Sequence, residues 1–425
     1  MVVSQLEGAR IPALEETYDV IIAGGGPAGV AAALAAARHN AKVLIIEKKE
    51  MLGGLATQGI VAYFAPLDDG NGYKVTRGIV EELFYLSVKY SYGTVQPFWS
   101  QPGAEFASDI AAAQAAPLRY FDSGMHGRCN TMFNVPAFAL AMEDEVCKAG
   151  ADIRFDTAIT DVVMDGNKCL GVVIEDYTGR RYIRGKTFVD ATGYGTLFTR
   201  AGAEMVYGEN KLTACAIETS FDYMQRGIDS EDMTKALHWT GWGYVPGVDE
   251  SQRSKVYQAN TAEDVTRYIM DTHRLLLQIL KQKREQTDSY CFAEIASQNS
   301  IRRVRRIIGR QPITEKDMFR YQRSSVGCVS DWRKCGPVFE IPYLSLFDAN
   351  ISNILAAGRI IASEGDVWDV TRTYNGAMLT GQAAGTAAAL ASSADVAPDA
   401  LPVKELQKAL EADNVLLHYE VQAMH

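Results

Sequence analysis

Apolar residues form short runs along the chain, and these runs predict a sheet that is buried on both faces. Residues 18–23 (Tyr-Asp-Val-Ile-Ile-Ala) and residues 42–46 are two such runs, and an alanine-rich helix is expected between them at Val30–Arg38. Together these elements make a β-α-β unit of about thirty residues. Further strands are expected at residues 152–155, 158–164, 169–175, 186–193 and 353–358, with a hairpin turn at residues 165–167.

The turn between the first strand and the helix carries the pattern Gly24-x-Gly26-x-x-Gly29. In such a pattern the first glycine permits a tight turn, the second lets the backbone approach a pyrophosphate, and the third lets helix and strand pack closely. The free N–H groups at the start of the helix then face the diphosphate. Glu47 ends the second strand, where an acid accepts hydrogen bonds from ribose hydroxyls and disfavours a 2′-phosphate. The sequence therefore predicts a dinucleotide site.

Further motifs favour FAD over NAD. Five residues, beginning with Lys48, separate Glu47 from Gly53-Gly54. Residues 190–193 read Asp-Ala-Thr-Gly. Both motifs resemble fingerprints of FAD enzymes in the glutathione-reductase-like superfamily. With residues 303–309, 313–317, 353–359 and 381–390, the chain from about Tyr18 to Ala391 resembles a bacterial family of FAD-dependent oxidoreductases. That family is similar to the flavoprotein subunits of fumarate reductase and succinate dehydrogenase.

The resemblance and the motifs together assign a set of FAD-binding residues. They are Gly24, Gly26, Pro27, Ala28, Gly29, Glu47, Lys48, Gly53, Gly54, Leu55, Ala56, Thr57, Ala191, Thr192, Gly193, Gly358, Arg359, Gly376 and Met378. Residues 53–59 contain no histidine, unlike relatives with a linked flavin, so noncovalent FAD is expected. Two departures leave the substrate chemistry open: Tyr194 and Thr196 replace the usual acids after the Ala-Thr-Gly turn, and residues 363–366 lack the usual histidine.

The remaining apolar periodicity predicts helices at residues 80–88, 134–149, 261–284, 301–308 and 375–391. Residues 204–345 are more polar and aromatic, with Trp239, Trp242, Tyr244 and Trp332. The expected fold class is α/β: a Rossmann-like FAD-binding domain, with a parallel sheet, helices on both faces and a β-meander, plus a second α+β substrate lobe. The FAD domain is assigned to residues 14–66, 130–203 and 346–395, the substrate lobe to residues 67–129 and 204–345, and a C-terminal helical segment to residues 396–425.

Composition narrows the expected partners. The net charge of −10 would repel nucleic acid and anionic lipid headgroups. The seven cysteines show no metal-type spacing, so no metal site is predicted, and the start of the chain lacks the pattern of a signal peptide. A cytoplasmic protein without a membrane segment is expected, and a homo-oligomer is compatible with the sequence. The basic stretch Arg302–Arg306 is read equally well as a solvated helix face and as an anion-binding site.

Flavin chemistry needs a substrate carbon at N5, an acid or base, and positive potential near N1 and O2. The resemblance implies that a helix beginning near Gly376–Met378 supplies about half a positive charge there. The candidates for proton transfer are His126, Glu364, Asp366, Arg372 and Tyr374. Arg372 is equally suited to a carboxylate clamp, a proton donor, or a salt bridge to Asp369 or Glu364.

The predicted function is an FAD-dependent oxidoreductase, a dehydrogenase or reductase that transfers a hydride between flavin N5 and a small polar metabolite. The electron acceptor or donor is unidentified, because the chain has no second Gly-x-Gly-x-x-Gly pattern and no Cys-x4-Cys pair. Two alternatives stay open at this point: a redox-neutral flavoenzyme such as an isomerase or hydratase, and a non-catalytic flavin-binding protein.

Overall fold

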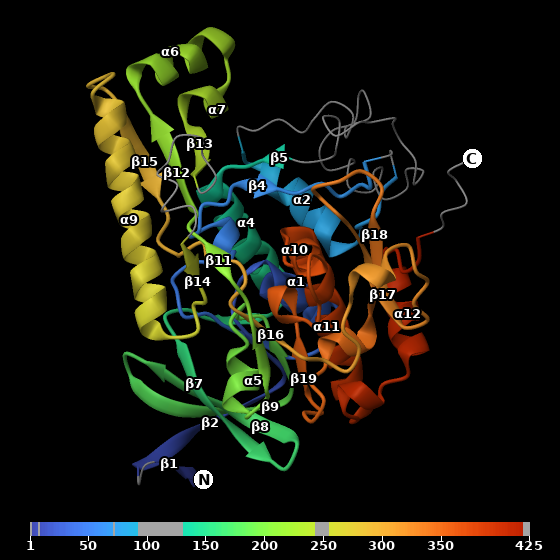
Figure 1. Ribbon diagram of the computed structural model, residues 1–425. Helices are drawn as coiled ribbons and strands as arrows, with labels where there is room; N and C mark the ends of the chain where they lie inside the picture. Colours follow the sequence, from blue (N-terminus) through green and yellow to red (C-terminus); the bar gives the residue numbers. More distant parts are fainter. Residues whose placement is uncertain (1, 7–8, 71–72, 92–130, 243–254, 420–425) are drawn as a thin grey trace.

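A mixed sheet forms one end of the molecule in the computed structural model, which describes residues 2–6, 9–70, 73–91, 131–242 and 255–419 (Figure 1). The sheet has eight strands. Its parallel part is β6 (Asp152–Arg154), β3 (Val43–Ile46), β2 (Ala9–Ala23), β9 (Gly179–Asp190) and β19 (Ile354–Ala356). The antiparallel part is β1 (Val2–Leu6), which pairs with β2, and the meander of β7 (Ala158–Asp165), β8 (Lys168–Asp176) and β9. The predicted α/β fold class with a β-meander is confirmed.

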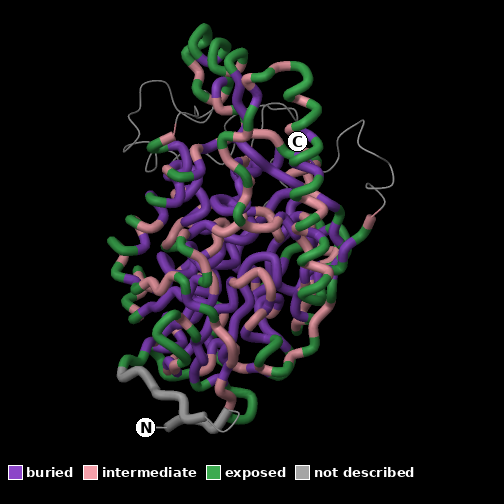
Figure 2. The backbone as a smooth tube through the Cα atoms, turned by 90° about the vertical axis from the view of Figure 1, so that its left-hand side faces the viewer, coloured by how far each residue is buried: buried purple, intermediate pink, exposed green. Residues whose placement is uncertain are grey.

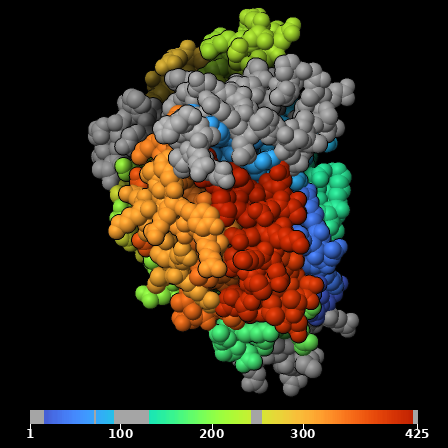
Figure 3. Space-filling view, turned by 90° about the vertical axis from the view of Figure 1, so that its right-hand side faces the viewer, coloured from blue at the N-terminus to red at the C-terminus, as the bar shows by residue number. Residues whose placement is uncertain are grey.

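Two helices rich in alanine and glycine pack against each other beside this sheet. They are α1 (Pro27–Arg38) and α11 (Tyr374–Ala394), and both are almost wholly buried. A Cβ atom added at Gly381 would lie 2.1 Å from the carbonyl oxygen of Ala28, so the two backbones touch directly. Figure 3 shows the red C-terminal part of the chain between the orange and the blue segments, so segments that are far apart in the sequence lie side by side.

The second lobe is built on a three-stranded antiparallel sheet with its own small core. Its elements are β12 (Ala214–Thr219), β13 (His238–Trp242), β15 (Cys291–Ile295), α6 (Phe221–Ser230), α7 (Met233–Ala236) and the long helix α9 (Ala262–Arg284). Figure 2 shows buried segments through the middle of the molecule and exposed segments towards both ends. The helix predicted at residues 261–284 is confirmed by α9.

The remaining helices and paired strands are shorter. The helices are α2 (Ile79–Lys89), α4 (Val135–Lys148), α5 (Thr196–Arg200), α10 (Val367–Thr371) and α12 (Val403–Ala412). The strand pairs are β4 (Tyr63–Phe64) with β5 (Thr131–Met132), β10 (Met205–Tyr207) with β16 (Arg305–Ile307), β11 (Asn210–Lys211) with β14 (Val256–Tyr257), and β17 (Ser325–Ser330) with β18 (Val338–Pro342).

The helix predicted at residues 301–308 is wrong, because Arg305–Ile307 forms strand β16. Arginine and isoleucine at these spacings favour a helix in isolation, but tertiary contacts override that preference. β16 pairs with β10, and the Asn210 side-chain oxygen accepts hydrogen bonds from the backbone N–H groups of Arg302 and Arg303. The basic stretch Arg302–Arg306 is therefore extended. Its arginines have different partners: Arg303 pairs with Asp369 and Arg306 with Glu364.

The domain boundaries stay a prediction. All strands of the large sheet from residue 14 onward lie in the segments assigned to the FAD domain. However, α2 and the β17–β18 hairpin, which fall in the segments assigned to the substrate lobe, contribute to the same hydrophobic core as α1 and α11. Among the described residues no helix is both long and apolar enough to cross a membrane.

Glu218 on β12 is a buried carboxylate whose oxygens face a ring of donors. Oε1 accepts hydrogen bonds from Thr240 (2.9 Å) and Tyr223 (3.1 Å) and lies 3.2 Å from Nδ1 of His238, while Tyr290 donates to Oε2. Burial alone would raise the pKa of Glu218, but the hydrogen bonds from these groups outweigh burial and hold the pKa at about 2.

The hydrogen bonds to Glu218 make the stability of the second lobe depend on pH. The pKa of Glu218 is about 2 in the folded protein against 4.5 ordinarily, so its contribution is complete above pH 4.5 and is lost as the pH falls from 4.5 towards 2. We expect Glu218→Gln to reduce the free energy of unfolding at pH 7 by about 3 kcal/mol. Urea unfolding between neutral pH and pH 3.5 should show a shallower loss of stability in the variant, and parallel curves for both proteins would contradict this account.

Candidate cofactor and substrate site

The three glycines of the turn before α1 have three different surroundings. Gly24 has a φ of 93° and an added Cβ would lie 2.8 Å from Cα of Thr192, while a Cβ at Gly29 would lie 1.9 Å from the carbonyl oxygen of Gly24. At Gly26 a Cβ would meet nothing within 4 Å. Gly24 and Gly29 are thus needed for the turn and for close packing, and Gly26 leaves open space at the start of α1.

The N-terminus of α1 is free to receive an anion. Gly26 is its N-cap residue, no side chain caps the helix, and its first turn carries no acid. The unpaired N–H groups and the positive end of the helix dipole therefore face the open space above Gly26. This is the arrangement that the diphosphate of a dinucleotide requires.

Glu47 lies at the end of β3, is 8 % exposed, and has a fixed orientation. Its Oε2 accepts a hydrogen bond from the Gly25 N–H (2.7 Å) and its Oε1 from the Lys49 N–H (2.9 Å). An ionised carboxylate has about four acceptor positions, so two remain for ribose hydroxyls. The loop after β3 continues through the short helix η1 (Gly54–Ala56), where an added Cβ at Gly54 would lie 3.2 Å from Cα of Gly26.

These residues line one continuous cavity, which we call the cofactor cavity. Its walls include thirteen of the residues assigned to FAD from the sequence, namely Gly24, Gly26, Pro27, Ala28, Glu47, Lys48, Gly54, Leu55, Ala191, Thr192, Gly193, Gly358 and Arg359. Arg372 and Tyr374, which the sequence suggested for catalysis, line it as well. Tyr194, Gln298, Ala357 and Ala377 also line it and were not assigned from the sequence.

Six assigned residues do not line the cofactor cavity: Gly29, Gly53, Ala56, Thr57, Gly376 and Met378. They shape the backbone behind it. Gly53 has a φ of 98°, the Thr57 hydroxyl donates to the Leu52 carbonyl (2.6 Å), and a Cβ at Gly376 would lie 2.4 Å from the Thr371 carbonyl oxygen. Direct FAD contact by these six stays a prediction.

Tyr194 follows the Ala-Thr-Gly turn at the place where the resembling family usually has an acid. Its ring lies 4.8 Å from the Lys48 ammonium and 5.0 Å from the Arg359 guanidinium. Burial would raise the pKa of Tyr194, but the charges of Arg359 and Lys48 lower it below its ordinary value. Tyr194 was noted in the sequence as a departure from the family pattern, and that departure was the available signal for a site residue.

A second cavity of about 550 Å³ adjoins the first, and we call it the aromatic cavity. Four residues line both cavities: Leu55, Arg359, Arg372 and Tyr374. The other lining residues of the aromatic cavity are Val61, Tyr63, Ala65, Lys211, Thr213, Cys215, Trp239, Gly241, Trp242, Arg302, Trp332 and Thr373. Most of them come from the second lobe, where the sequence showed only a general enrichment in aromatic residues.

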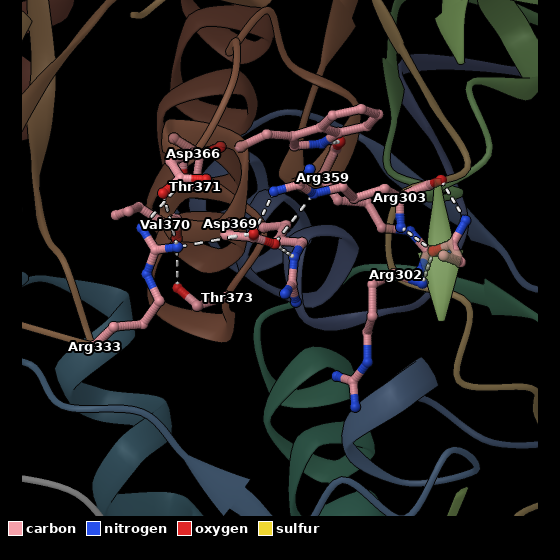
Figure 4. Close-up of polar contacts among 12 residues, drawn as sticks. Arg302, Arg303, Arg333, Arg359, Asp366, Asp369, Val370, Thr371 and Thr373 are labelled. Atoms are coloured by element: carbon pink, nitrogen blue, oxygen red, sulfur yellow. Dashed lines mark hydrogen bonds and ion pairs between the residues drawn. The ribbon is translucent and has the colours of Figure 1, made fainter. Parts of the chain in front are cut away.

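Arg372 is both an ion-pair partner and a wall of the two cavities. Its Nε lies 2.5 Å from Oδ1 of Asp369. Nε of Arg303 donates to the same oxygen (3.2 Å), and Figure 4 shows Arg303 and Asp369. Burial lowers the pKa of Arg372 to about 10, although Asp369 acts in the opposite direction. Of the two salt bridges considered from the sequence, the one to Asp369 is present and the one to Glu364 is not.

Arg359 is held by backbone carbonyl groups and not by an acid. Its Nε donates to the Gly193 carbonyl (2.7 Å) and another guanidinium nitrogen donates to the Ile301 carbonyl. Burial lowers the pKa of Arg359 below its ordinary value. Arg359 follows Gly358 in the short helix η5 (Gly358–Ile360), which comes directly after strand β19. The end of β19 therefore positions the Arg359 side chain at the walls of both cavities.

Tyr374 is the first residue of α11 and lines both cavities. Its hydroxyl donates to the Val61 carbonyl (2.9 Å), and its ring packs edge-on against Phe64. Burial raises the pKa of Tyr374 far above its ordinary value. The helix begins at Tyr374, two residues before the predicted start near Gly376, and its N-cap residue Thr373 lines the aromatic cavity.

Glu364 and Asp366 line neither cavity, and a catalytic role for either of them stays a prediction. After η5 the chain pairs Ser363 with Ile313 and turns to the surface. The side chains of Glu364 and Asp366 are 49 % and 62 % exposed, and their charged partners are Arg306 and Arg333, each at 3.5 Å. His126, the fifth proton-transfer candidate, lies outside the described residues, as does Tyr244.

The sequence profile of the FAD dependent oxidoreductase family matches residues 19–225 and 217–410, and the chain belongs to this family. Among curated relatives, a digeranylgeranylglycerophospholipid reductase of Picrophilus torridus is 23 % identical over 52 % of this chain and 49 % of its own length. Digeranylgeranylglycerophospholipid reductase 2 of Methanococcoides burtonii is 24 % identical over 48 % of this chain and 45 % of its own length. The chain spans about half the length of these curated relatives.

Solved structures give a weaker likeness. The p-nitrophenol 4-monooxygenase PnpA of Pseudomonas putida aligns over 96 % of this chain and 91 % of its own, at 11 % identity and a TM-score of 0.48. A geranylgeranyl bacteriochlorophyll reductase-like protein of Thermoplasma acidophilum aligns over 96 % and 94 %, at 14 % identity and a TM-score of 0.42. None of these comparisons shows the finer resemblance to fumarate reductase and succinate dehydrogenase subunits.

The residues present fit FAD. Open space stands over Gly26 in front of an uncapped helix, and a buried carboxylate, Glu47, lines the same cavity at the end of the neighbouring strand. The cofactor cavity continues to Arg359 and Arg372, whose charges suit the electron-rich edge of a reduced flavin. Among the described residues no cluster of three or more histidine, cysteine, aspartate or glutamate side chains is arranged to hold a metal ion.

Proposed function

We propose that the chain transfers a hydride between the N5 position of FAD and a small organic substrate that binds in the aromatic cavity. The observation that carries this proposal is that the two cavities share four wall residues, Leu55, Arg359, Arg372 and Tyr374. A flavin ring at this boundary would have the dinucleotide part behind it and the substrate in front of it. Bound FAD would supply the hydride acceptor or donor, and the protein would supply position and charge.

The residues at the boundary have distinct proposed roles. Arg372 and Arg359 provide positive charge near the ring, together with the N-terminal end of α11. Tyr374 has a structural role at the boundary and not an acid–base role. Its hydroxyl already donates to the Val61 carbonyl, and its raised pKa keeps the proton on the hydroxyl. Arg372, with a pKa of about 10, is the proposed proton donor among the candidates that line the cavities.

The relatives support a flavin-dependent reduction more than a particular substrate. Two of them are named as reductases of a digeranylgeranylglycerophospholipid, but each match covers about half of either chain. The partners that we propose for this chain are a small-molecule substrate and a separate electron donor or acceptor, and we propose that it works in the cytoplasm with noncovalent FAD. The net charge of −10 supports the absence of a nucleic-acid partner.

The test is an anaerobic titration of the FAD-loaded protein. Organic acids, alcohols and amines are added to the oxidised protein, and candidate acceptors to the photoreduced protein, while the visible flavin spectrum is followed. We expect one chemical class to bleach or restore the spectrum at a rate that Arg372→Met reduces at least tenfold. Acid precipitation should release the yellow colour into the supernatant. A flavin that no compound reduces or reoxidises, or turnover without any net redox change, would overturn the proposal in favour of a redox-neutral or binding role.

A further inference from the structure

The aromatic cavity has an unusual balance of charge for a protein with a net charge of −10. Its walls carry Lys211, Arg302, Arg359 and Arg372, and no carboxylate among the described residues lines it. Asp369 does not line the cavity, and it pairs with both Arg372 and Arg303. Three guanidinium groups, those of Arg302, Arg359 and Arg372, therefore share this cavity, and Asp369 pairs with one of them.

Arg302 differs from the other guanidinium groups of this region. Arg303 and Arg372 pair with Asp369, Arg333 pairs with Asp331, and Arg359 donates to backbone carbonyls. Within the described part of the chain, the Arg302 side chain has no hydrogen bond or ion pair, and Figure 4 shows it pointing away from Asp369. Its charge nevertheless acts on Cys215, Tyr374 and Arg372, which are all walls of the aromatic cavity.

Several cations at one cavity repel one another, and that repulsion is relieved when an anion binds among them. A guanidinium group binds a carboxylate through two parallel hydrogen bonds, which makes a carboxylate the best partner for an arginine without one. Arg302 is half-buried and lines the cavity, so such a pair would form in surroundings where water screens it only partly.

The rest of the wall is apolar and largely aromatic. Trp239, Trp242, Trp332, Tyr63 and Tyr374 surround the space. The polar ends of two of these rings already have partners: Nε1 of Trp239 donates to the Ile60 carbonyl (2.6 Å) and Nε1 of Trp332 donates to the Asp369 carbonyl (3.1 Å). Their ring surfaces are left for contacts with a planar or apolar group.

Gly241 adds space to the same wall. It lies opposite Cys215 in the β12–β13 pair, and an added Cβ would lie 3.3 Å from the ring of Trp239. The cavity volume of about 550 Å³ falls in the range of sites that hold small organic ligands. A purely polar metabolite would leave these rings without a contact, so the lining favours a substrate with an apolar part.

We propose that the substrate of this site is an aromatic or similarly planar carboxylate, whose carboxylate binds Arg302 and whose ring packs among Trp239, Trp242 and Trp332. This inference rests on the proposed function and narrows its substrate class. It replaces a small polar metabolite by a monoanionic molecule with a large apolar face. Arg302 is a binding and positioning residue in this proposal, and Arg372 stays the group beside the flavin.

The test compares charged and neutral ligands of one shape. Benzoate, phenylacetate, 3-phenylpropionate and indole-3-acetate are each titrated into the FAD-loaded protein beside the corresponding primary amide. Binding is followed by the perturbation of the flavin spectrum and by the quenching of tryptophan fluorescence. We expect at least one carboxylate to bind tenfold or more tightly than its amide, and aliphatic acetate to bind more weakly than all four.

Arg302→Gln should remove the preference for the carboxylate, so that acid and amide bind with equal, weak affinity, and Arg302→Lys should restore part of it. The matched control is Arg320→Gln, which removes one exposed arginine outside both cavities and should leave the preference unchanged. Equal binding of acids and amides to the unchanged protein, an unaltered preference in Arg302→Gln, or no binding of any of the four acids would overturn the inference.

Failure of this inference is distinguishable from failure of the proposed function. Ligand affinity is read without turnover, so a carboxylate preference that depends on Arg302 stands even if no compound reduces the flavin. Conversely, reduction of the flavin by a neutral alcohol, with no carboxylate binding, would leave the oxidoreductase proposal intact and remove only the aromatic acid.

Discussion

Gly26→Ala is expected to weaken FAD binding by about 100-fold while the apoprotein stays folded. The added methyl group meets no protein atom within 4 Å, and the φ of −69° at Gly26 is one that alanine adopts freely. The methyl group would instead occupy the space in front of the α1 N-terminus, where the diphosphate must approach the backbone. Overpacking of about 1–3 kcal/mol corresponds to a loss of affinity of this order. The FAD content after gel filtration and the affinity by titration of the apoprotein measure it.

Gly29→Ala provides the contrast, because its methyl group would lie 1.9 Å from the carbonyl oxygen of Gly24. Backbone atoms have to move in this variant, so its apoprotein should unfold at a lower temperature than that of Gly26→Ala. Similar unfolding temperatures for both variants, or normal FAD binding by Gly26→Ala, would contradict the assignment of the two glycines to cofactor approach and to packing.

Asp369→Asn is expected to destabilise the protein by about 3 kcal/mol at pH 7. The Asp369 carboxylate is 21 % exposed and neutralises both Arg303 and Arg372, so the amide would leave two guanidinium groups without an acid. Removing one partner of a mostly buried ion pair has a cost of this size, because the remaining charge is left unpaired. Urea unfolding of the two proteins measures the difference.

The acid dependence of this effect has a definite sign. Burial would raise the pKa of Asp369, but Arg372 and Arg303 lower it below the ordinary 3.8. The stabilisation is therefore present above pH 3.8 and disappears as the pH falls below it, so the two proteins should converge in strong acid. Asp366→Asn is the matched control: that side chain is 62 % exposed and lies 3.5 Å from Arg333, and its removal should change stability by less than about 1 kcal/mol. An equal loss of stability in Asp369→Asn and Asp366→Asn would contradict the role of Asp369 as the shared acid of Arg303 and Arg372.

The cofactor cavity was the most predictable part of the molecule because its geometry is local. The spacing of Gly24, Gly26 and Gly29 and the distance to Glu47 are set by one strand, one turn and one helix, and each step follows from backbone sterics. The same holds for the hairpin of β7 and β8, whose turn lies at the predicted residues. The β16 strand was not predictable in this way, since its partners β10 and Asn210 lie about a hundred residues away in the sequence.

The aromatic cavity could be predicted only in composition. Its walls come from η1, from β12 and β13, and from single residues such as Arg302, Trp332 and Arg372, which no periodicity links. Enrichment in tryptophan indicated the lobe, and the basic stretch indicated an anion, but nothing in the sequence placed the one beside the other. Glu364 and Asp366 show how little sequence distance says about place: they follow Arg359 closely in the sequence, but their side chains are 49 % and 62 % exposed and line neither cavity.

The direct contact between α1 and α11 bears on when the protein becomes able to hold its cofactor. α1 is made early in synthesis, whereas α11 begins at Tyr374, and its glycines must lie against the carbonyl groups of Ala28 and Ala32. A nascent chain that lacks α11 would expose the alanine face of α1 and miss one wall of the cofactor cavity. Contacts of such long sequence separation form late and slowly. Loading with FAD is therefore expected only after α11 has been made and has packed against α1, and before that the exposed apolar face of α1 is open to aggregation.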